Sequence, residues 1–156
     1  MGRMNKVFRR SHLTPYEADY ALWCAEQGVL LREGRFTDLD RENLAEEIES
    51  LGRSDKREIE SRLKVLLVHL LKLQFQPEKA KPGWKSTIIE QRGRLLKVMK
   101  ESPSLRSYPD AVLAEEYAYA CAEAAVETGL DVEIFPRICP YSVDQILDLQ
   151  FYPVPS

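Results

Sequence analysis

The sequence predicts an all-α protein, an antiparallel bundle of about four main helices followed by a short C-terminal helix. Apolar residues recur at intervals of three and four along most of the chain, as they do on one face of a helix. No alternating apolar and polar run predicts a strand. A length of 156 residues with 44% hydrophobic side chains suffices for one buried core. We therefore expect a flexible arm over residues 1–13 and a single helical domain over residues 14–156.

The first helix is predicted by a capping pattern near the N-terminus. The Thr14 hydroxyl can cap the helix, Pro15 suits its first turn, and Glu17 completes a capping box. Aromatic and leucine residues then follow at helical spacing until Gly34, which can adopt the left-handed conformation that ends a helix. The first helix should run from about residue 15 to residue 32.

The second helix should begin near residues 37–40 and extend almost to Pro77. Gly52 costs about 1 kcal/mol relative to alanine inside a helix, and Ser54 can cap a new segment, so a continuous and a bent helix are both open. Between residues 63 and 73 apolar side chains occupy nearly every side, which places this segment at the centre of the bundle. The residues that keep the helical spacing are Leu44, Ile48, Leu51, Ile59, Leu63, Leu66, Leu70 and Leu73.

Proline and glycine separate the remaining helices. Residues 77–83 read as a loop, and a third helix containing Trp84 and Met99 should end before Pro103. After a turn over residues 103–109, the spacing predicts a fourth helix that ends at Gly129.

A second capping box opens the last helix. Ser142 and Gln145 have the spacing of such a box, and the short helix that they begin should reach about Leu149.

Charge and composition exclude several classes of protein. A formal net charge of -3 gives no strong overall field for nucleic acid or anionic lipid. The longest uninterrupted apolar run in the buried segment, residues 65–68, stops at His69, so no membrane span is expected. The N-terminus carries no signal peptide pattern, and the three cysteines include no C-x-x-C pair, which is typical of reduced thiols. We therefore expect a soluble, cytoplasmic protein.

Several separated motifs resemble those of one bacterial family, catalogued as "domain of unknown function 29". The resemblance extends from about residue 15 to residue 150. It implies a compact α-helical domain and no particular activity or catalytic residue. The motifs are Tyr16-Glu17-x-Asp19-Tyr20-x-x-Trp23, Asn43-Leu44-x-Glu46-Glu47-Ile48-Glu49-Ser50-Leu51-Gly52-Arg53, His69-Leu70-Leu71-Lys72, Trp84, Gln91-Arg92, Pro103-Ser104-Leu105-Arg106 and Phe135-Pro136-x-x-Cys139-Pro140-Tyr141.

Four polar residues form a candidate cluster: Asn43, Glu47, His69 and Arg92. With Leu44 and Ile48 pointing inward, Asn43 and Glu47 lie on one shoulder of the apolar stripe, where polar groups need partners. They either bind a ligand or pair internally, with Arg92 as one possible partner. His69 lies on an almost wholly apolar segment, as a core residue, a base or a metal ligand. In one continuous helix it would lie roughly 33 Å from Glu47 along the axis.

No motif supplies a complete catalytic or metal-binding set. The chain has no paired cysteines, no His-x-x-x-His or Glu-x-x-His spacing, and no Gly-x-Ser-x-Gly nucleophile motif. We expect neither a cofactor nor a bound metal. A metal-assisted hydrolase or nuclease that uses Asn43, Glu47 and His69 remains the alternative from the class of enzymes.

A basic stretch near the third helix is the best indication of nucleic-acid binding. Basic side chains near an exposed aromatic ring can hold a phosphate backbone and stack a base, and Trp84 lies within this stretch. The other interpretation is a solvated helix face with Trp84 in the core. The basic residues are Lys79, Lys81, Lys85, Arg92, Arg94, Lys97 and Lys100.

The absence of a complete catalytic set favours a binding function. Our leading hypothesis is a non-enzymatic cytoplasmic module that binds another protein. Nucleic-acid binding through the basic stretch is less favoured, and a homodimer is possible where a helix face remains uncovered.

Overall fold

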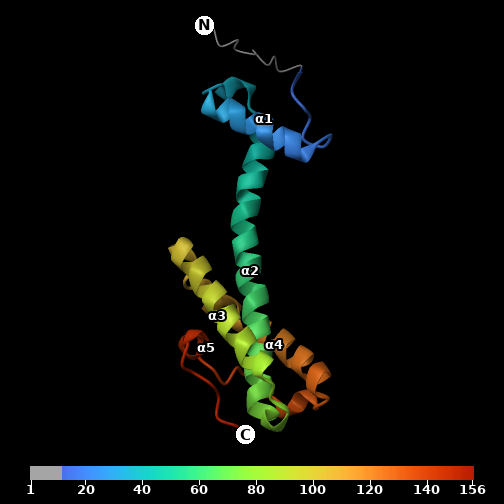
Figure 1. Ribbon diagram of the computed structural model, residues 1–156, viewed down its shortest axis with the longest axis vertical. Coiled ribbons are helices and arrows are strands. Elements are labelled where there is room, and N and C mark those ends of the chain that lie inside the picture. The colour runs from blue at the N-terminus through green and yellow to red at the C-terminus, as the bar shows by residue number, and fades with distance from the viewer. Residues whose placement is uncertain (1–11) are drawn as a thin grey trace. The chain divides into compact units, whose positions relative to one another are not determined.

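The computed structural model describes residues 12–156, and most of the predicted N-terminal arm, residues 1–11, lies outside this range. Within it the fold is all-α, with four long helices, a short fifth and no strand, as the sequence predicts (Figure 1). Short 3-10 turns precede α2 to α5. The helices are α1 (Tyr20–Arg32), α2 (Arg41–Phe75), α3 (Pro82–Glu101), α4 (Tyr108–Thr128) and α5 (Val143–Leu147).

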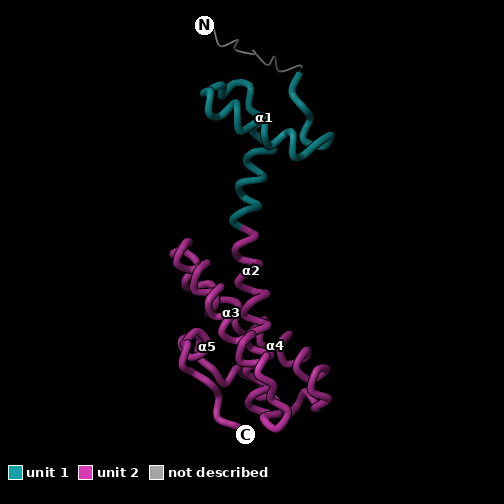
Figure 2. The backbone as a smooth tube through the Cα atoms, in the orientation of Figure 1, with its two compact units in different colours: residues 1–52 teal, residues 53–156 magenta. Residues whose placement is uncertain are grey.

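The chain divides into two compact units (Figure 2). The N-terminal unit ends at Gly52, and the C-terminal unit covers Arg53–Ser156. The boundary falls inside α2, whose helical pattern continues through Gly52. The sequence left a continuous and a bent helix equally open. A single domain over residues 14–156 stays a prediction.

The start of α1 differs from the prediction. The helix begins at Tyr20 rather than near Pro15, because Asp19 caps it by accepting from the backbone N–H of Leu22 at 3.0 Å. Thr14 does not cap a helix, since its hydroxyl donates to the Glu26 carboxylate at 2.9 Å. The predicted stop is confirmed: Gly34 has a φ of 69°, in the left-handed region that glycine favours.

The N-terminal part of α2 corrects a second expectation. Ile48 and Leu51 do not point inward: their side chains are 66% and 70% exposed. The half-buried side of this segment carries Asn43, Leu44 and Glu47 instead. The reason is that tyrosine side chains from the region of α1 bond to Glu47, which turns the polar shoulder rather than the apolar stripe toward the unit's interior.

The C-terminal unit has one continuous hydrophobic core. The predicted central segment is confirmed, because Leu63, Leu66, Leu67, Leu70 and Leu71 are fully buried. Residues of α3 and α4, together with side chains of the C-terminal segment, complete the cluster. This burial is the main source of stability for the unit.

Cross-helix bonds give the direction of each helix in this unit. Ser102, at the end of α3, lies 3.4 Å from Asp55 near the start of the unit, so α3 runs antiparallel to α2. Tyr108 at the start of α4 donates to Glu60, and Lys72 pairs with Glu127 near the end of α4. The three segments therefore form an up-down-up bundle.

The remaining turns follow the predicted signals closely. Gly129 ends α4 with a φ of 74°, and the capping box of Ser142 and Gln145 opens α5, which ends at Leu147. The predicted loop over residues 77–83 is shorter, since α3 begins at Pro82. No helix within residues 12–156 has the length and hydropathy to cross a membrane.

Candidate functional site

Glu47 of the predicted polar cluster is held by two tyrosines of the N-terminal unit. The Tyr16 hydroxyl donates to Glu47 Oε1, and the Tyr20 hydroxyl donates to Glu47 Oε2 at 2.8 Å. These bonds lower the pKa of Glu47 and raise the pKa of Tyr16 and of Tyr20, because they stabilise the carboxylate and the neutral phenols. Glu47 is therefore ionised at neutral pH and has both oxygens engaged.

Asn43 belongs to a second network built on Asp40. The Asn43 amide donates to Asp40 Oδ2 at 2.8 Å, and the Trp23 indole N–H donates to the same oxygen at 3.0 Å. The backbone N–H of Asp40 donates to the buried Gln27 side chain at 2.8 Å. This network fixes the residue that precedes α2 against the centre of α1.

Aromatic packing joins the two networks. The Tyr16 ring lies edge-on to Trp23 with centroids 4.9 Å apart, and the Tyr20 ring stacks on Trp23 at 6.1 Å. The sequence left open whether Asn43 and Glu47 bind a ligand or pair within the protein. Both pair within the protein, and their partners lie in or next to α1 and at the start of α2, whereas Arg92 is not among them.

The other two residues of the predicted cluster belong to the C-terminal unit. The Nδ1 atom of His69 lies 2.8 Å from the carbonyl oxygen of Val65, one turn earlier in α2, and the ring is half-buried. This bond is local to the helix, so His69 has the geometry of a hydrogen-bonded packing residue.

Arg92 is fully buried and attaches the C-terminal segment to α3. It donates through Nε to the carbonyl of Ile146 and through Nη2 to the carbonyl of Phe151, both at 2.7 Å. Its guanidinium also lies over the Tyr152 ring, 5.4 Å from the centroid. Burial lowers the pKa of Arg92, the effect expected for a cation removed from water. Each of the four predicted residues therefore bonds within its own unit.

The predicted basic surface carries exposed lysines, but the Trp84 ring that was expected beside them is buried. Trp84 is only 9% exposed, and the ammonium of Lys72 lies 4.5 Å from its ring centroid. Lys85 lies over Tyr152, and Arg94 pairs with Glu90 at 3.3 Å. Lys79, Lys81, Lys97 and Lys100 are exposed. Their arrangement is that of a solvated helix face, with Trp84 in the core.

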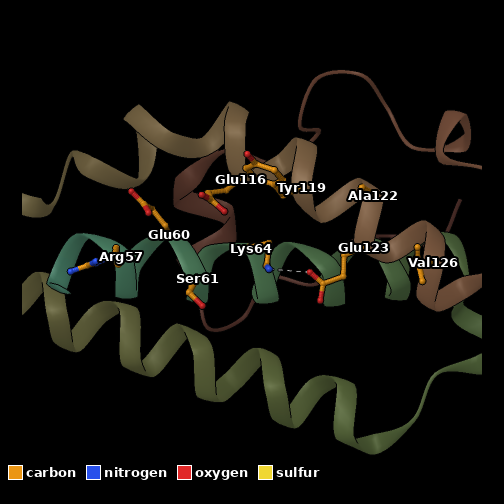
Figure 3. A pocket seen from close by; sticks show the side chains of 9 residues that line it. All are labelled: Arg57, Glu60, Ser61, Lys64, Glu116, Tyr119, Ala122, Glu123 and Val126. Carbon is orange, nitrogen blue, oxygen red and sulfur yellow. Dashed lines mark ion pairs between the residues drawn. The ribbon is translucent and has the colours of Figure 1, made fainter. Parts of the chain in front are cut away.

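A groove between α2 and α4 is a site that the sequence did not reveal (Figure 3). It is open, has a volume of about 660 Å³, and lies entirely within the C-terminal unit. Glu60 on its α2 side accepts from Tyr108, and Lys64 pairs with Glu123 at 3.2 Å. The lining residues are Arg57, Glu60, Ser61, Lys64, Glu116, Tyr119, Ala122, Glu123 and Val126.

Glu116 is the unusual group in this groove. Its side chain belongs to a residue only 9% exposed, and it has no hydrogen bond or ion pair with any residue from 12 to 156. Burial and the neighbouring carboxylates of Glu60 and Glu115 raise its pKa, against the opposing effect of Lys64. One sequence signal was present: Glu116 lies three residues after Leu113 and four before Ala120, on the edge of the predicted apolar face.

No three histidine, cysteine or carboxylate side chains converge into a possible metal site within the described part of the chain. The metal-assisted hydrolase hypothesis therefore receives no support from the placement of Asn43, Glu47 and His69.

Comparison with known proteins gives a family and nothing finer. No curated protein matches the chain, and no solved structure does. One family model, Domain of unknown function DUF29, matches residues 15–152, which is most of the sequence and includes both compact units. The chain belongs to the DUF29 family.

Proposed function

We propose that this protein is a non-enzymatic binding module whose N-terminal unit docks a basic, amphipathic helix of a partner protein. The observation that carries the proposal is the imbalance between buried and exposed apolar residues over residues 12–52. Only Trp23 and Leu30 are buried apolar residues there. The large apolar side chains that remain exposed are Tyr20, Leu22, Val29, Leu31, Phe36, Ile48 and Leu51.

Such an imbalance is unusual for a segment of this size. Units of roughly 40 residues rarely bury enough surface to be stable without an added partner or cross-link. Exposed apolar side chains that lie together on a surface are common at sites that bind other proteins. Ile48 and Leu51 are three residues apart in α2, so they share one helix face.

Charge supports the choice of partner. Residues 12–52 contain ten aspartates and glutamates against three lysines and arginines, whereas residues 53–156 contain fifteen of each. The whole acidic excess of the described chain is therefore in the N-terminal unit, together with the exposed apolar residues named above. A helix with one apolar face and flanking lysines or arginines complements both properties.

The internal hydrogen bonds of Asn43 and Glu47 also support a binding function rather than a catalytic one. Both Glu47 oxygens already accept hydroxyl donors, and Asn43 donates to Asp40. The three cysteines are free, which supports a reducing, cytoplasmic setting for the module.

The test measures binding of a labelled helical peptide of leucine and lysine to the full chain by fluorescence anisotropy. The basic peptide should bind at low salt, and its affinity should fall as the salt concentration rises. A scrambled peptide of the same composition and a version with glutamate for lysine should bind much less. The double variant Ile48→Glu/Leu51→Glu should weaken binding by about tenfold or more.

A matched control uses apolar residues of the C-terminal unit that are even more exposed than Ile48 and Leu51. Ile138→Glu/Val154→Glu alters side chains that are 83% and 81% exposed, and should leave binding unchanged. Equal binding of the acidic peptide would contradict the proposal. So would a dimer in sedimentation velocity that Ile48→Glu/Leu51→Glu dissociates, because the occupant would then be a second copy of the chain.

A further inference from the structure

Two hollows in the N-terminal unit border Leu13, the second residue that the structure describes. We propose that they are the docking site of the basic segment that immediately precedes them in the chain, residues 1–11. One hollow receives arginine side chains of this segment, and the other receives one of its apolar side chains. Neither hollow is lined by Ile48 or Leu51, so this inference does not rest on the proposed function.

The first argument is charge. Residues 1–11 contain no aspartate or glutamate, whereas residues 12–52 contain ten, against three lysines and arginines. The C-terminal unit, with fifteen charges of each sign, offers no net attraction to a basic segment. Opposite charges attract when they lie within the screening length of about 8 Å at physiological salt. The N-terminal unit therefore complements this segment. Its basic residues are Arg3, Lys6, Arg9 and Arg10.

The second argument is the chemistry of the larger hollow, which we call the acidic hollow. It has a volume of about 220 Å³, and two carboxylates line it without any lysine or arginine. Asp38 pairs with Arg35 at 2.9 Å, and Asp40 accepts from the neutral donor groups of Trp23 and Asn43. An ionised carboxylate can accept about four hydrogen bonds, so a guanidinium can add to those already present. The lining residues are Leu13, Thr14, Trp23, Gln27, Asp38, Leu39 and Asp40.

The third argument is the smaller hollow, the apolar hollow, lined by Leu13, Ala25, Glu26 and Val29. The Glu26 carboxylate accepts from the backbone N–H and the hydroxyl of Thr14, at 2.7 and 2.9 Å. The rest of the lining is aliphatic, so an apolar occupant gains by leaving water. A volume of about 130 Å³ is below the range of small-molecule sites and is suited to a single side chain.

The connection to Leu13 selects the occupant. An extended chain spans at most about 3.6 Å per residue, so the Cα atom of Arg10 lies within about 11 Å of that of Leu13, and that of Phe8 within about 18 Å. Both hollows are therefore within reach of the segment. A short tether also gives a local concentration on the order of millimolar, which a separate molecule must exceed to displace the segment.

Nuclear magnetic resonance of the ¹⁵N-labelled full chain tests this proposal. No partner peptide is used, so the result is independent of the proposed function. Arg9→Glu/Arg10→Glu should shift the amide resonances of Val29 and Asp40, because the reversed charges cannot stay beside the acidic hollow. The order parameter of the Phe8 amide should lie above about 0.6 in the unaltered chain and below it in this variant. Salt near 1 M should move the unaltered chain toward the variant.

Controls separate docking from a general effect of charge. Lys79→Glu/Lys81→Glu makes the same change in charge at exposed lysines of the C-terminal unit, and should leave the Val29 and Asp40 resonances unchanged. Ala25→Trp tests the apolar hollow without a change in charge. Ala25 is exposed on α1, so the indole should fill this hollow, and the order parameter of the Phe8 amide should fall.

Three results would overturn the proposal. The first is a Phe8 order parameter below about 0.6 in the unaltered chain, together with unchanged Val29 and Asp40 resonances in Arg9→Glu/Arg10→Glu. The second is an equal shift of these resonances in the lysine control. The third is a dependence of the shifts on protein concentration, because the occupant would then be residues 1–11 of a second copy of the chain.

Discussion

The two units of the chain are stabilised by different means. In the N-terminal unit a hydrogen bond from Trp23 to Asp40 joins α1 to the start of α2, and the Tyr16 ring packs on Trp23. Among residues 12–52, Leu30 is the only other fully buried apolar residue. The C-terminal unit instead buries a continuous cluster in which Leu63, Leu66 and Leu70 are completely inaccessible to solvent.

The same contrast holds for charge and for what each surface can bind. The N-terminal unit combines an acidic excess with exposed apolar residues, which is suited to docking a larger partner. The C-terminal unit is balanced in charge, and the open groove between α2 and α4 is lined by both acidic and basic side chains. Apolar burial and the acidic excess of the described residues therefore belong to different units.

Trp23→Ala is the variant with the largest expected effect on this contrast between the two units. Truncation of a buried tryptophan typically costs about 3–5 kcal/mol, and here it also removes the indole donor to Asp40. Hydrogen exchange should show loss of protection in α1 while the segment from Leu63 to Leu73 stays protected. Loss of protection over the whole chain would contradict two units of separate stability.

The corresponding change in the C-terminal unit is Leu66→Ala. Replacing a fully buried leucine by alanine should cost about 2–5 kcal/mol, because a cavity forms where the core cannot collapse. Denaturation followed by circular dichroism measures this loss. The exposed control, Ile138→Ala, should change the free energy of unfolding by less than about 0.5 kcal/mol. Similar costs for both variants would remove the distinction between core and surface in this unit.

The sequence predicted the fold well where a helix end or a buried segment depends only on residues that are close together in the chain. Gly34, Gly129 and the capping box at Ser142 fixed helix ends, because each depends on a few neighbouring residues. The apolar run from Leu63 to Leu73 was buried as expected, since it presents apolar atoms on nearly every side. The stripe of Ile48 and Leu51 misled the prediction, because periodicity states which residues share a face and not whether another element covers it.

The candidate sites show the same limit. Glu47 and Asn43 were recognised as polar groups that need partners, but Tyr16 lies in a turn before α1, where helical spacing gives no guidance. Glu116 escaped notice because its isolation results from the positions of Glu60 and Lys64 on α2, which the sequence of α4 does not contain. Partners across helices require the tertiary structure.

The pH dependence of Glu116→Gln sharpens the contrast at the groove. The folded state raises the pKa of Glu116, so its neutral form is favoured; this contribution to stability is complete below the usual glutamate pKa of 4.5 and is lost as pH rises through the raised value. Glu116→Gln should therefore be more stable than the unaltered protein near neutral pH, because the amide carries no charge that burial or the carboxylates of Glu60 and Glu115 disfavour. The difference should shrink near pH 4, measured by denaturation at both pH values. A constant difference would indicate that Glu116 has a partner.

Glycine variants give smaller and opposite effects on the two sides of the unit boundary. Gly129 has a φ of 74°, so Gly129→Ala should destabilise by about 1 kcal/mol although no atom lies within 4 Å of the added methyl group. Gly52 lies inside α2 and also has open space around it, so Gly52→Ala should stabilise by about 0.5–1 kcal/mol. Thermal unfolding of both variants measures these changes. Destabilisation by Gly52→Ala would show that the junction between the units needs a flexible residue.

The smallest expected effect concerns the tyrosines that hold Glu47. Their hydroxyls lower the pKa of Glu47 in the folded state, so the stability that they contribute is present above the usual value of 4.5 and is lost as pH falls through the lowered pKa. Tyr16→Phe and Tyr20→Phe should each raise the pKa of Glu47 toward 4.5, with the larger change for Tyr16→Phe, whose hydroxyl makes the dominant contribution. Carboxyl carbon shifts in an NMR titration measure this directly. Because these bonds lie at the surface of the N-terminal unit, the loss of stability should be smaller than the change, in either direction, that is expected for the glycine variants. An unchanged pKa in both variants would mean that water replaces the phenols without cost, and that the hydrogen bonds of Trp23 and Gln27 to Asp40 hold α1 against the start of α2.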